Sequence, residues 1–156
     1  MANTYYQIHV HLVFAAKERY PFLTGQHQKN IHAYLAGKAK EHECYINAIG
    51  GTEDHLHILI NISPKISISE IAKTLKGSSS HYINERKMSP AHFEWQTGYG
   101  AFSVSQSNVS KVTEYIRNQP EHHRKCSFSE EYISLLGKHK IDYDKQFIFR
   151  PCVKDE

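Results

Sequence analysis

Residues 44–62 read CYINAIGGTEDHLHILINI, and this stretch decides the fold. Cys44–Ile49 is rich in residues that favour strands, and so is His55–Ile62. The segment between them, Gly50-Gly51-Thr52-Glu53-Asp54, is typical of a turn. The stretch therefore predicts an antiparallel hairpin whose second strand carries two histidines.

The segments that precede the hairpin predict one strand and one helix. Apolar residues alternate with polar ones from Tyr6 to Phe14, which indicates a half-buried strand. Thr24 is a suitable N-cap for a helix that continues to about Glu43, with Ile31 among the residues on its apolar face.

The segments that follow the hairpin repeat this order. Ser69 opens a predicted helix that ends near Met88, and residues 93–104 predict a strand with bulges at Gly98 and Gly100. The order β-α-β-β-α-β predicts an α+β protein with the ferredoxin-like split arrangement.

Beyond that unit, the chain predicts a C-terminal helical extension. A helix follows Ser107 and is stopped by Pro120, and a shorter helix covers residues 129–138. Residues 146–149 predict an extended end, and residues 137–156 hold no motif that we can assign. With no internal repeat or low-complexity linker, we expect one domain.

Composition excludes several classes of protein. The chain has 156 residues, and 40% of them are apolar, so it is neither disordered nor a multi-domain machine. Three widely spaced cysteines (Cys44, Cys126 and Cys152) indicate a reduced compartment rather than a disulfide framework. With no signal-peptide pattern and no apolar run of about 20 residues, we expect a cytoplasmic protein with no membrane partner.

Charge is distributed unevenly along the chain. The formal net charge of +3 is too mild to identify a nucleic-acid partner by itself. Residues 1–126 hold 14 basic and 10 acidic residues, whereas residues 127–156 hold 5 and 6. A polyanion would therefore meet the first part of the chain rather than its tail.

Histidine is unusually frequent, with 12 copies, and two of them form the clearest candidate site. On a strand, His55 and His57 project from the same face, as two imidazoles must to bind one metal ion. For an isolated pair, an ordinary polar strand face is the preferred interpretation. For the second such pair, His9 and His11, a polar strand surface is the preferred interpretation, with a contact to the metal site as the alternative.

A second candidate lies on the helix before Pro120. Tyr115 and Gln119 are four residues apart and share one helical face, which is an unusual pairing unless that face serves a site. Taken without the histidines, the simpler interpretation is that Tyr115 packs in the core and Gln119 is solvated.

Zinc binding is a further possibility that the spacing does not favour. The candidate ligands would be His42, Cys44, His122, His123 and Cys126. No spacing among them matches a known zinc module, so we do not expect this site.

Together, these features resemble the HUH-type single-strand tyrosine transposases, the small TnpA-like enzymes of the insertion sequence 200/605 family. Five blocks in the same order carry the resemblance: Ala16–Tyr20 (AKERY), Asp54–His57 (DHLH), Leu75–Ser80 (LKGSSS), Phe93–Gly100 (FEWQTGYG) and Tyr115–Pro120 (YIRNQP).

The resemblance implies roles for particular residues. His55, His57 and Gln119 would bind a divalent metal ion, with Asp54 in support, and Tyr115 would be the nucleophile. The ion would be Mg²⁺ or Mn²⁺, and Mn²⁺ suits imidazole ligands better. Residues 1–126 would then form the catalytic domain, including the tyrosine helix, and residues 127–156 its C-terminal helix and tail.

The resemblance also implies a substrate and partners. The enzyme would bind hairpins at element ends, cleave single-stranded DNA and rejoin it through a 5′-phosphotyrosine. It would be a homodimer, in which the tyrosine helix of one subunit often completes the histidine site of the other.

Basic side chains on two helical regions are the expected phosphate contacts. They are Lys73, Lys76, Arg86 and Lys87, supported by Ser78, and Lys111, Arg117, Arg124 and Lys125. Trp95, Tyr99 and Phe102 could stack on bases, although we expect at least half of these aromatics to be buried.

Two other functions remain open from the sequence. Ferredoxin-like sheets with aromatic strands also form non-catalytic modules for single-stranded nucleic acid, although no RNP1-like run is present here. The HUH chemistry could instead serve plasmid relaxation, replication initiation or repeat processing by a domesticated transposase.

Overall fold

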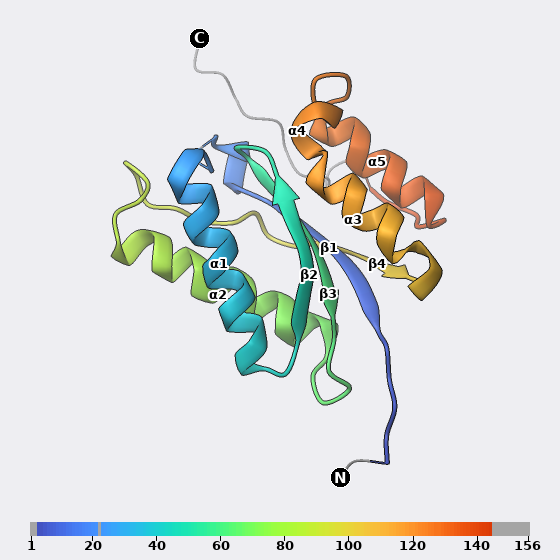
Figure 1. The fold of residues 1–156 in the computed structure, drawn as a ribbon. Helices are drawn as coiled ribbons and strands as arrows, with labels where there is room; N and C mark the ends of the chain where they lie inside the picture. The colour runs from blue at the N-terminus through green and yellow to red at the C-terminus, as the bar shows by residue number, and fades with distance from the viewer. Residues whose placement is uncertain (1–2, 22, 145–156) are drawn as a thin grey trace.

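The computed structural model describes residues 3–21 and 23–144, which form a four-stranded antiparallel sheet with helices on both faces (Figure 1). The strands lie in the order β2-β3-β1-β4. Their bounds are β1 (His9–Ala15), β2 (Tyr45–Gly51), β3 (His55–Asn61) and β4 (Gly100–Val104). This order is that of the ferredoxin-like split arrangement, so the predicted fold class is confirmed.

Two long helices, α1 (Gly25–Glu41) and α2 (Ile68–Glu85), cover one face of the sheet (Figure 1). The strand residues that point to this face are apolar, because side chains alternate along a strand. Leu12 and Ile58 are partners in the β1–β3 register, and both pack in the main core with Leu35 of α1 and Leu75 of α2.

Three shorter helices cover the opposite face: α3 (Val109–Arg117), α4 (Gln119–His122) and α5 (Phe128–Lys138). Phe102 of β4 packs there against Phe128 and Tyr132 of α5, and Leu59 of β3 packs against Ile116 of α3. This face is therefore a second core rather than a solvated surface.

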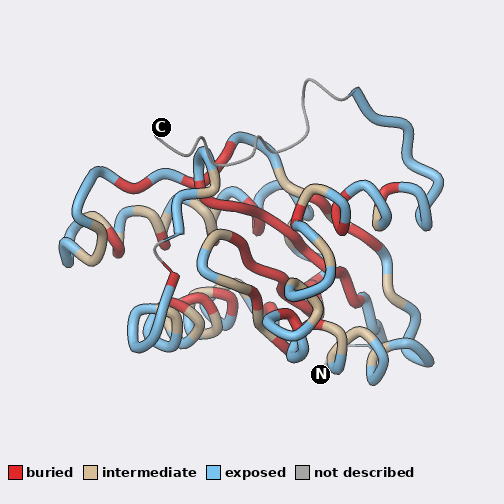
Figure 2. Tube along the Cα trace, turned by 90° about the horizontal axis from the view of Figure 1, so that it is seen from above, coloured by how far each residue is buried: buried red, intermediate tan, exposed pale blue. Residues whose placement is uncertain are grey.

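The prediction that the first strand is half-buried is wrong, because a second layer of helices covers its other face. All seven residues of β1 are buried, so it is not half-buried (Figure 2). His9 and His11 are buried as well, and their interpretation as a polar strand surface is wrong. The alternation in the sequence is real, but it separates an apolar core from a core that also contains histidines.

Glycine allows α3 to lie close to the sheet. Gly50 and Gly51 were expected in the turn, but both belong to β2. A Cβ atom at Gly50 would collide with the backbone carbonyl group of Ile116 in α3. Only a residue without a side chain permits this approach of helix to strand.

The predicted strand over residues 93–104 is shorter than expected, since β4 begins only at Gly100. Upstream, a single bridge joins Trp95 to Ala16. Side chains of α2 take up much of the backbone hydrogen bonding here: Asn84 bonds the N–H and C=O groups of Phe93, and Lys76 Nζ donates to the carbonyls of Gln96 and Gly98. Those groups are not available for a ladder.

The helix ends differ from the predictions by a few residues. Ser67 rather than Ser69 caps α2, by accepting a hydrogen bond from the Glu70 N–H. Pro120 does not stop a helix; α3 ends at Arg117, and Pro120 lies in the first turn of α4, where its missing N–H costs little. The predicted extended end at 146–149 lies outside the described residues.

Candidate metal and tyrosine site

The site is built on the face of β3 that points toward the second layer of helices, α3, α4 and α5. His55 and His57 project to that face side by side, and Leu56 and Ile58 point to the main core. Both imidazoles are completely buried. Buried polar groups require partners, so their neighbours define the site.

Tyr115 and Gln119 reach the same place from the junction of α3 and α4. Gln119 is buried, and its Oε1 lies 3.1 Å from His55 Nε2. The Tyr115 ring lies edge-on to the His57 ring, with 5.8 Å between the ring centroids. The structure thus brings together the tyrosine, the amide and the two histidines that the sequence singled out.

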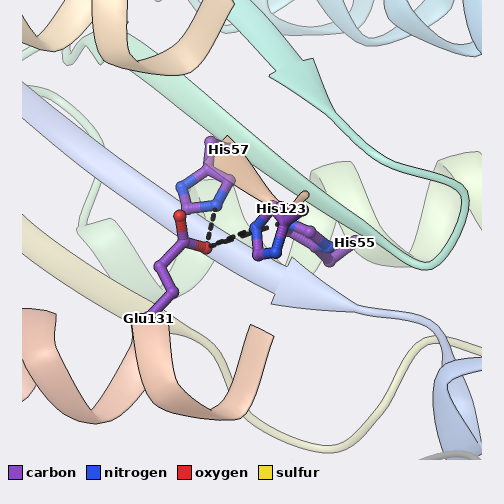
Figure 3. Close-up of side chains that lie close together, drawn as sticks. All are labelled: His55, His57, His123 and Glu131. Atoms are coloured by element: carbon purple, nitrogen blue, oxygen red, sulfur yellow. Dashed lines mark hydrogen bonds and ion pairs between the residues drawn. The ribbon is translucent and has the colours of Figure 1, made fainter. Parts of the chain in front are cut away.

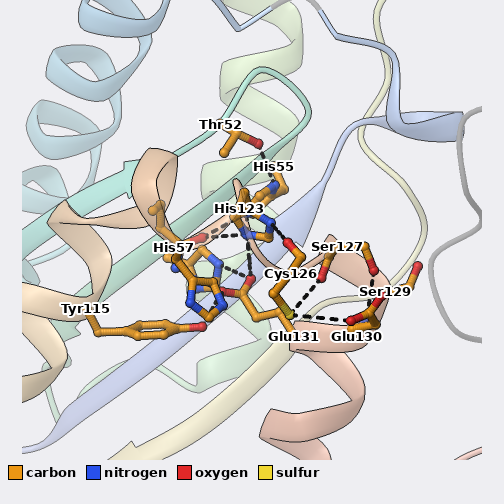
Figure 4. A network of polar contacts seen from close by, with 12 residues as sticks. Thr52, His55, His57, Tyr115, His123, Cys126, Ser127, Ser129, Glu130 and Glu131 are labelled. Atoms are coloured by element: carbon orange, nitrogen blue, oxygen red, sulfur yellow. Dashed lines mark hydrogen bonds and ion pairs between the residues drawn. The ribbon is translucent and has the colours of Figure 1, made fainter.

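A residue that the sequence did not single out, Glu131 of α5, lies at the centre of this group. Its Oε1 is 2.8 Å from Nε2 of His57, 3.1 Å from Nε2 of His123 and 3.7 Å from Nε2 of His55 (Figure 3). Its Oε2 accepts hydrogen bonds from the hydroxyl of Tyr115, whose ring lies beside it in Figure 4, and from Gln119 Nε2. One carboxylate therefore joins every member of the site.

The Nδ1 atoms of the three imidazoles also have hydrogen-bonding partners, which fix the orientation of each ring. His55 Nδ1 lies 2.8 Å from Asp54 Oδ1 and 3.0 Å from Thr52 Oγ1. His57 Nδ1 lies 2.8 Å from His11 Nε2, and His123 Nδ1 donates to the carbonyl of Cys126 at 2.8 Å. Each Nε2 is consequently turned toward Glu131.

Electrostatics within the group follow from burial and from the single carboxylate. Burial lowers the pKa of His57 to about 4, against the opposing effect of Glu131, and lowers the pKa of His11 to about 3. Burial also opposes charge on His123, but the hydrogen bond and charge of Glu131 outweigh it and raise that pKa. His123 thus carries a proton more readily than His57 or His11.

The acidic and phenolic groups shift in opposite directions. Burial alone would raise the pKa of Glu131, yet hydrogen bonds from His123, His57 and Tyr115 hold it well below its ordinary value. Burial raises the pKa of Tyr115, and the neighbouring Glu131 carboxylate raises it further. Glu131 is therefore ionised while Tyr115 is a neutral phenol.

The donor set fits a transition-metal ion. One ligand atom each from His55, His57, His123 and Glu131 lie within 4.8 Å of one another. Ligand atoms about 2.0–2.2 Å from one ion lie about 3.3–3.6 Å apart in a tetrahedral site, so these four atoms need to draw together only slightly to bind a common ion. Three imidazoles and one carboxylate suit Mn²⁺ or Zn²⁺ better than Mg²⁺, which prefers oxygen ligands.

The zinc set that the sequence did not favour is not brought together in the described part of the chain, although one of its members belongs to this site. His123 joins the cluster, and His122 Nε2 lies 3.2 Å from Glu131 Oε2. Cys126 contributes its backbone carbonyl rather than its thiol. Cys44 packs in the main core on the other face of the sheet.

The predicted DNA contacts fall into two groups on opposite faces of the sheet. Lys73, Lys76, Ser78, Arg86 and Lys87 lie on or just after α2, away from the histidines. Within this group, Lys76 Nζ and the Ser78 hydroxyl already bond backbone carbonyls. Lys111, Arg117, Arg124 and Lys125 lie on or just after α3 and α4, close to Tyr115, and all four are exposed.

Most of the candidate stacking aromatics are buried, as expected. Trp95 is buried and donates to Ser79 Oγ at 2.9 Å, and Phe102 packs in the second core. Tyr99 is only partly buried against the main core. Among the described residues, none of the helices combines the length and the hydropathy needed to span a membrane.

Comparison with known proteins places these features in one family. Residues 4–119 match the family model described as "Transposase IS200 like". The transposase for insertion sequence element IS200 of Salmonella typhimurium is 30% identical over 127 residues, which span 78% of this chain and 82% of that protein. The ISDra2 transposase TnpA of Deinococcus radiodurans is 25% identical over 124 residues, spanning 73% and 85%.

Solved structures show the same fold. A transposase candidate from Deinococcus radiodurans superposes with a TM-score of 0.61 at 23% identity, over 76% of this chain and 95% of that one. A REP-associated tyrosine transposase bound to a REP hairpin superposes with a TM-score of 0.58 at 16% identity, over 79% and 73%.

Proposed function

Because the chain belongs to the IS200-like transposase family, we propose that it cleaves and rejoins single-stranded DNA at hairpin-bearing element ends, with Tyr115 as the nucleophile. One observation carries this proposal: the Tyr115 hydroxyl, both strand histidines and Gln119 meet at the Glu131 carboxylate. A phenol buried only for packing would not need these neighbours.

In the proposed step, the Tyr115 oxygen attacks a backbone phosphorus atom. The bond from the tyrosine oxygen to phosphorus forms as the bond from phosphorus to the 3′ oxygen breaks. The departing 3′ oxygen takes a proton from water, so the products are a 5′-phosphotyrosine and a free 3′-hydroxyl. Since one phosphodiester replaces another, rejoining to a new 3′ end needs no nucleotide triphosphate. Glu131 Oε2 already accepts the hydrogen bond from the phenol, so it is placed to take the phenolic proton.

The residues that would hold the metal ion are His55 and His57 through Nε2 and Gln119 through Oε1, with His123 and Glu131 within reach. When bound there, a divalent ion would polarise the scissile phosphate and neutralise its developing charge. Asp54 supports His55 by holding its Nδ1. We propose Mn²⁺ over Mg²⁺ because most of these donors are imidazoles.

We further propose that the DNA lies along α3 and α4, on the face that carries Tyr115. Lys111, Lys125 and Arg124 are exposed there and would contact phosphates without reading sequence. A relative of the same fold is bound to a REP hairpin, which supports a hairpin substrate. We propose a homodimer as well, with residues 1–126 and 127–156 acting as one domain.

The test is a covalent adduct. Purified protein is mixed with hairpin-bearing single strands from the DNA that flanks its gene, with Mn²⁺ or Mg²⁺, and the products are separated under denaturing conditions. We expect a protein–DNA adduct that chelator and Tyr115→Phe both abolish. Tyr45→Phe is the matched control, because Tyr45 is 56% exposed and lies in β2, remote from the cluster. An adduct that survives Tyr115→Phe would exclude Tyr115 as the nucleophile.

A further inference from the structure

A cavity of about 570 Å³ opens beside the histidine cluster. The residues that line it include Arg19, Thr24, Asp54, His123, Arg124 and Ser127. Its volume lies within the range of small-molecule sites. Tyr115 does not line this cavity; it borders a second one of about 560 Å³. His123 is the cluster histidine that lines the first cavity, and Cys126 lines both cavities.

Arg19 supplies positive charge to the first cavity. Its guanidinium lies 5.9 Å from the centroid of the Phe128 ring, and Nη1 lies 3.4 Å from Ser129 Oγ. Its Nε atom is buried and has no hydrogen-bond partner in the part of the chain that the structure describes. An arginine with an uncommitted donor, supported by an aromatic ring, is suited to bind phosphate.

The backbone that carries Arg19 is strained. Glu18 and Arg19 both have positive φ angles, of 56° and 51°, a region that residues other than glycine rarely adopt. Such strain is concentrated at ligand clamps and active sites, because packing elsewhere must maintain it. The Ala16–Tyr20 stretch is also one of the five blocks of the resemblance, and neither Tyr115 nor the histidines explain it.

The N-terminus of α1 adds to the positive potential. This 17-residue helix begins at the cavity with no acidic residue in its first turn and no side-chain cap from Thr24. The start of α5 also lies at the cavity, but Ser127 caps it and two glutamates occupy its first turn, so α5 does not contribute in the same way. Free N–H groups at helix starts favour anions. Two carboxylates, those of Glu53 and Asp54, also line the cavity. The Asp54 carboxylate is already hydrogen-bonded to His55 and Thr52.

We propose that this cavity binds the nucleotide on the 5′ side of the scissile phosphate, with Arg19 contacting that nucleotide's own 5′-phosphate. The inference rests on the proposed function, since it takes Tyr115 as the attacking group. In phosphoryl transfer the attacking and leaving oxygens lie roughly in line. The 3′ oxygen must therefore depart away from Tyr115, and in Figure 4 the cavity residue Ser127 lies across the histidines from Tyr115.

Two small nucleotides test this placement by calorimetry in the presence of Mn²⁺. Thymidine 3′,5′-bisphosphate carries both phosphates, and thymidine 3′-monophosphate lacks the one assigned to Arg19. We expect the wild-type chain to bind the bisphosphate about tenfold more tightly, the effect of one charge-assisted contact. Arg19→Met should abolish this preference while retaining the contact with Phe128, and Arg19→Lys should restore part of it.

Lys40→Ala is the matched control, because Lys40 is exposed in the last turn of α1 and does not line the cavity. Equal affinities in the wild-type chain, or a preference that persists in Arg19→Met, would overturn the proposal. The adduct assay distinguishes failure of the Arg19 nucleotide site from failure of the proposed cleavage by Tyr115. A chain that forms the Tyr115 adduct without an Arg19-dependent preference loses only the subsite, and a chain with the preference but no adduct retains the nucleotide site without the cleavage chemistry.

Discussion

Gly50→Ala tests whether Tyr115 acts beside the histidines of its own chain. Gly50 is paired with His57 in the β2–β3 register, and α3 crosses directly above it. An added Cβ would collide with the Ile116 carbonyl group and lie 3.2 Å from Ile116 Cγ2. Because the collision is with backbone, rotation of a side chain cannot relieve it, and α3 must shift together with Tyr115.

The expected loss of stability in Gly50→Ala is measured against the same substitution at a second glycine, Gly37. Overpacking of this kind costs about 1–3 kcal/mol. Gly37 lies inside α1 with nothing within 4 Å of its Cβ position, so Gly37→Ala should stabilise the chain by about 1 kcal/mol. The two variants should therefore differ by about 2–4 kcal/mol in the free energy of unfolding. At about 3 °C per kcal/mol, that is a difference of about 6–12 °C in Tm.

Two measurements test this prediction. Thermal unfolding gives the Tm of each variant, and the adduct assay, run at a temperature where both variants are folded, gives the rate of adduct formation. We expect Gly50→Ala to have the lower Tm and to form the adduct more slowly, and Gly37→Ala to leave the adduct unchanged. If Gly50→Ala is as stable as Gly37→Ala, α3 does not pack on its own β2 in solution. Tyr115 would then have to meet a histidine site other than the one beside it here.

Three further predictions concern the charges of the site and of α2. Glu131→Gln should weaken Mn²⁺ binding tenfold or more in a calorimetric titration, whereas Glu130→Gln, at an exposed neighbouring position, should not. In chelator-treated protein, the free energy of unfolding by urea should fall as the pH drops from 6.5 toward about 4, because the unfolded chain then takes up a proton that buried His57 does not; a flat profile would contradict this. Lys76→Met should lower Tm but leave the affinity for a fluorescent single-stranded oligonucleotide unchanged, since Lys76 Nζ is committed to two backbone carbonyls, whereas Lys111→Met should weaken that binding.

Local patterns predicted the parts of the site that depend on local geometry. Alternation along a strand places His55 beside His57, and the spacing of four residues brings Tyr115 and Gln119 to one side, even though a helix boundary falls between them. The β-α-β-β-α-β order likewise follows from periodicities of two and 3.6 residues. Each of these inferences needs only neighbours in the chain.

Long-range packing determined what the sequence did not predict. Glu131 is 74 residues from His57, and no short-range pattern links them. One signal was present: Glu131 lies on the apolar face of α5, where Phe128 and Leu135 pack at i−3 and i+4. A carboxylate in an apolar stripe requires a buried partner. The same layer of helices explains why β1 is buried on both faces.

The position of Glu131 has a consequence for how the site works. It already accepts hydrogen bonds from Tyr115 and Gln119, and DNA would bring a second anion to the same buried group. Two anions at such close range beside a buried carboxylate would repel each other strongly. A divalent cation bound by the histidines would reduce that repulsion, so metal and DNA should each bind more tightly when the other is present. We therefore expect Glu131 to make DNA binding at Tyr115 dependent on metal, and Glu131→Gln to remove most of that dependence.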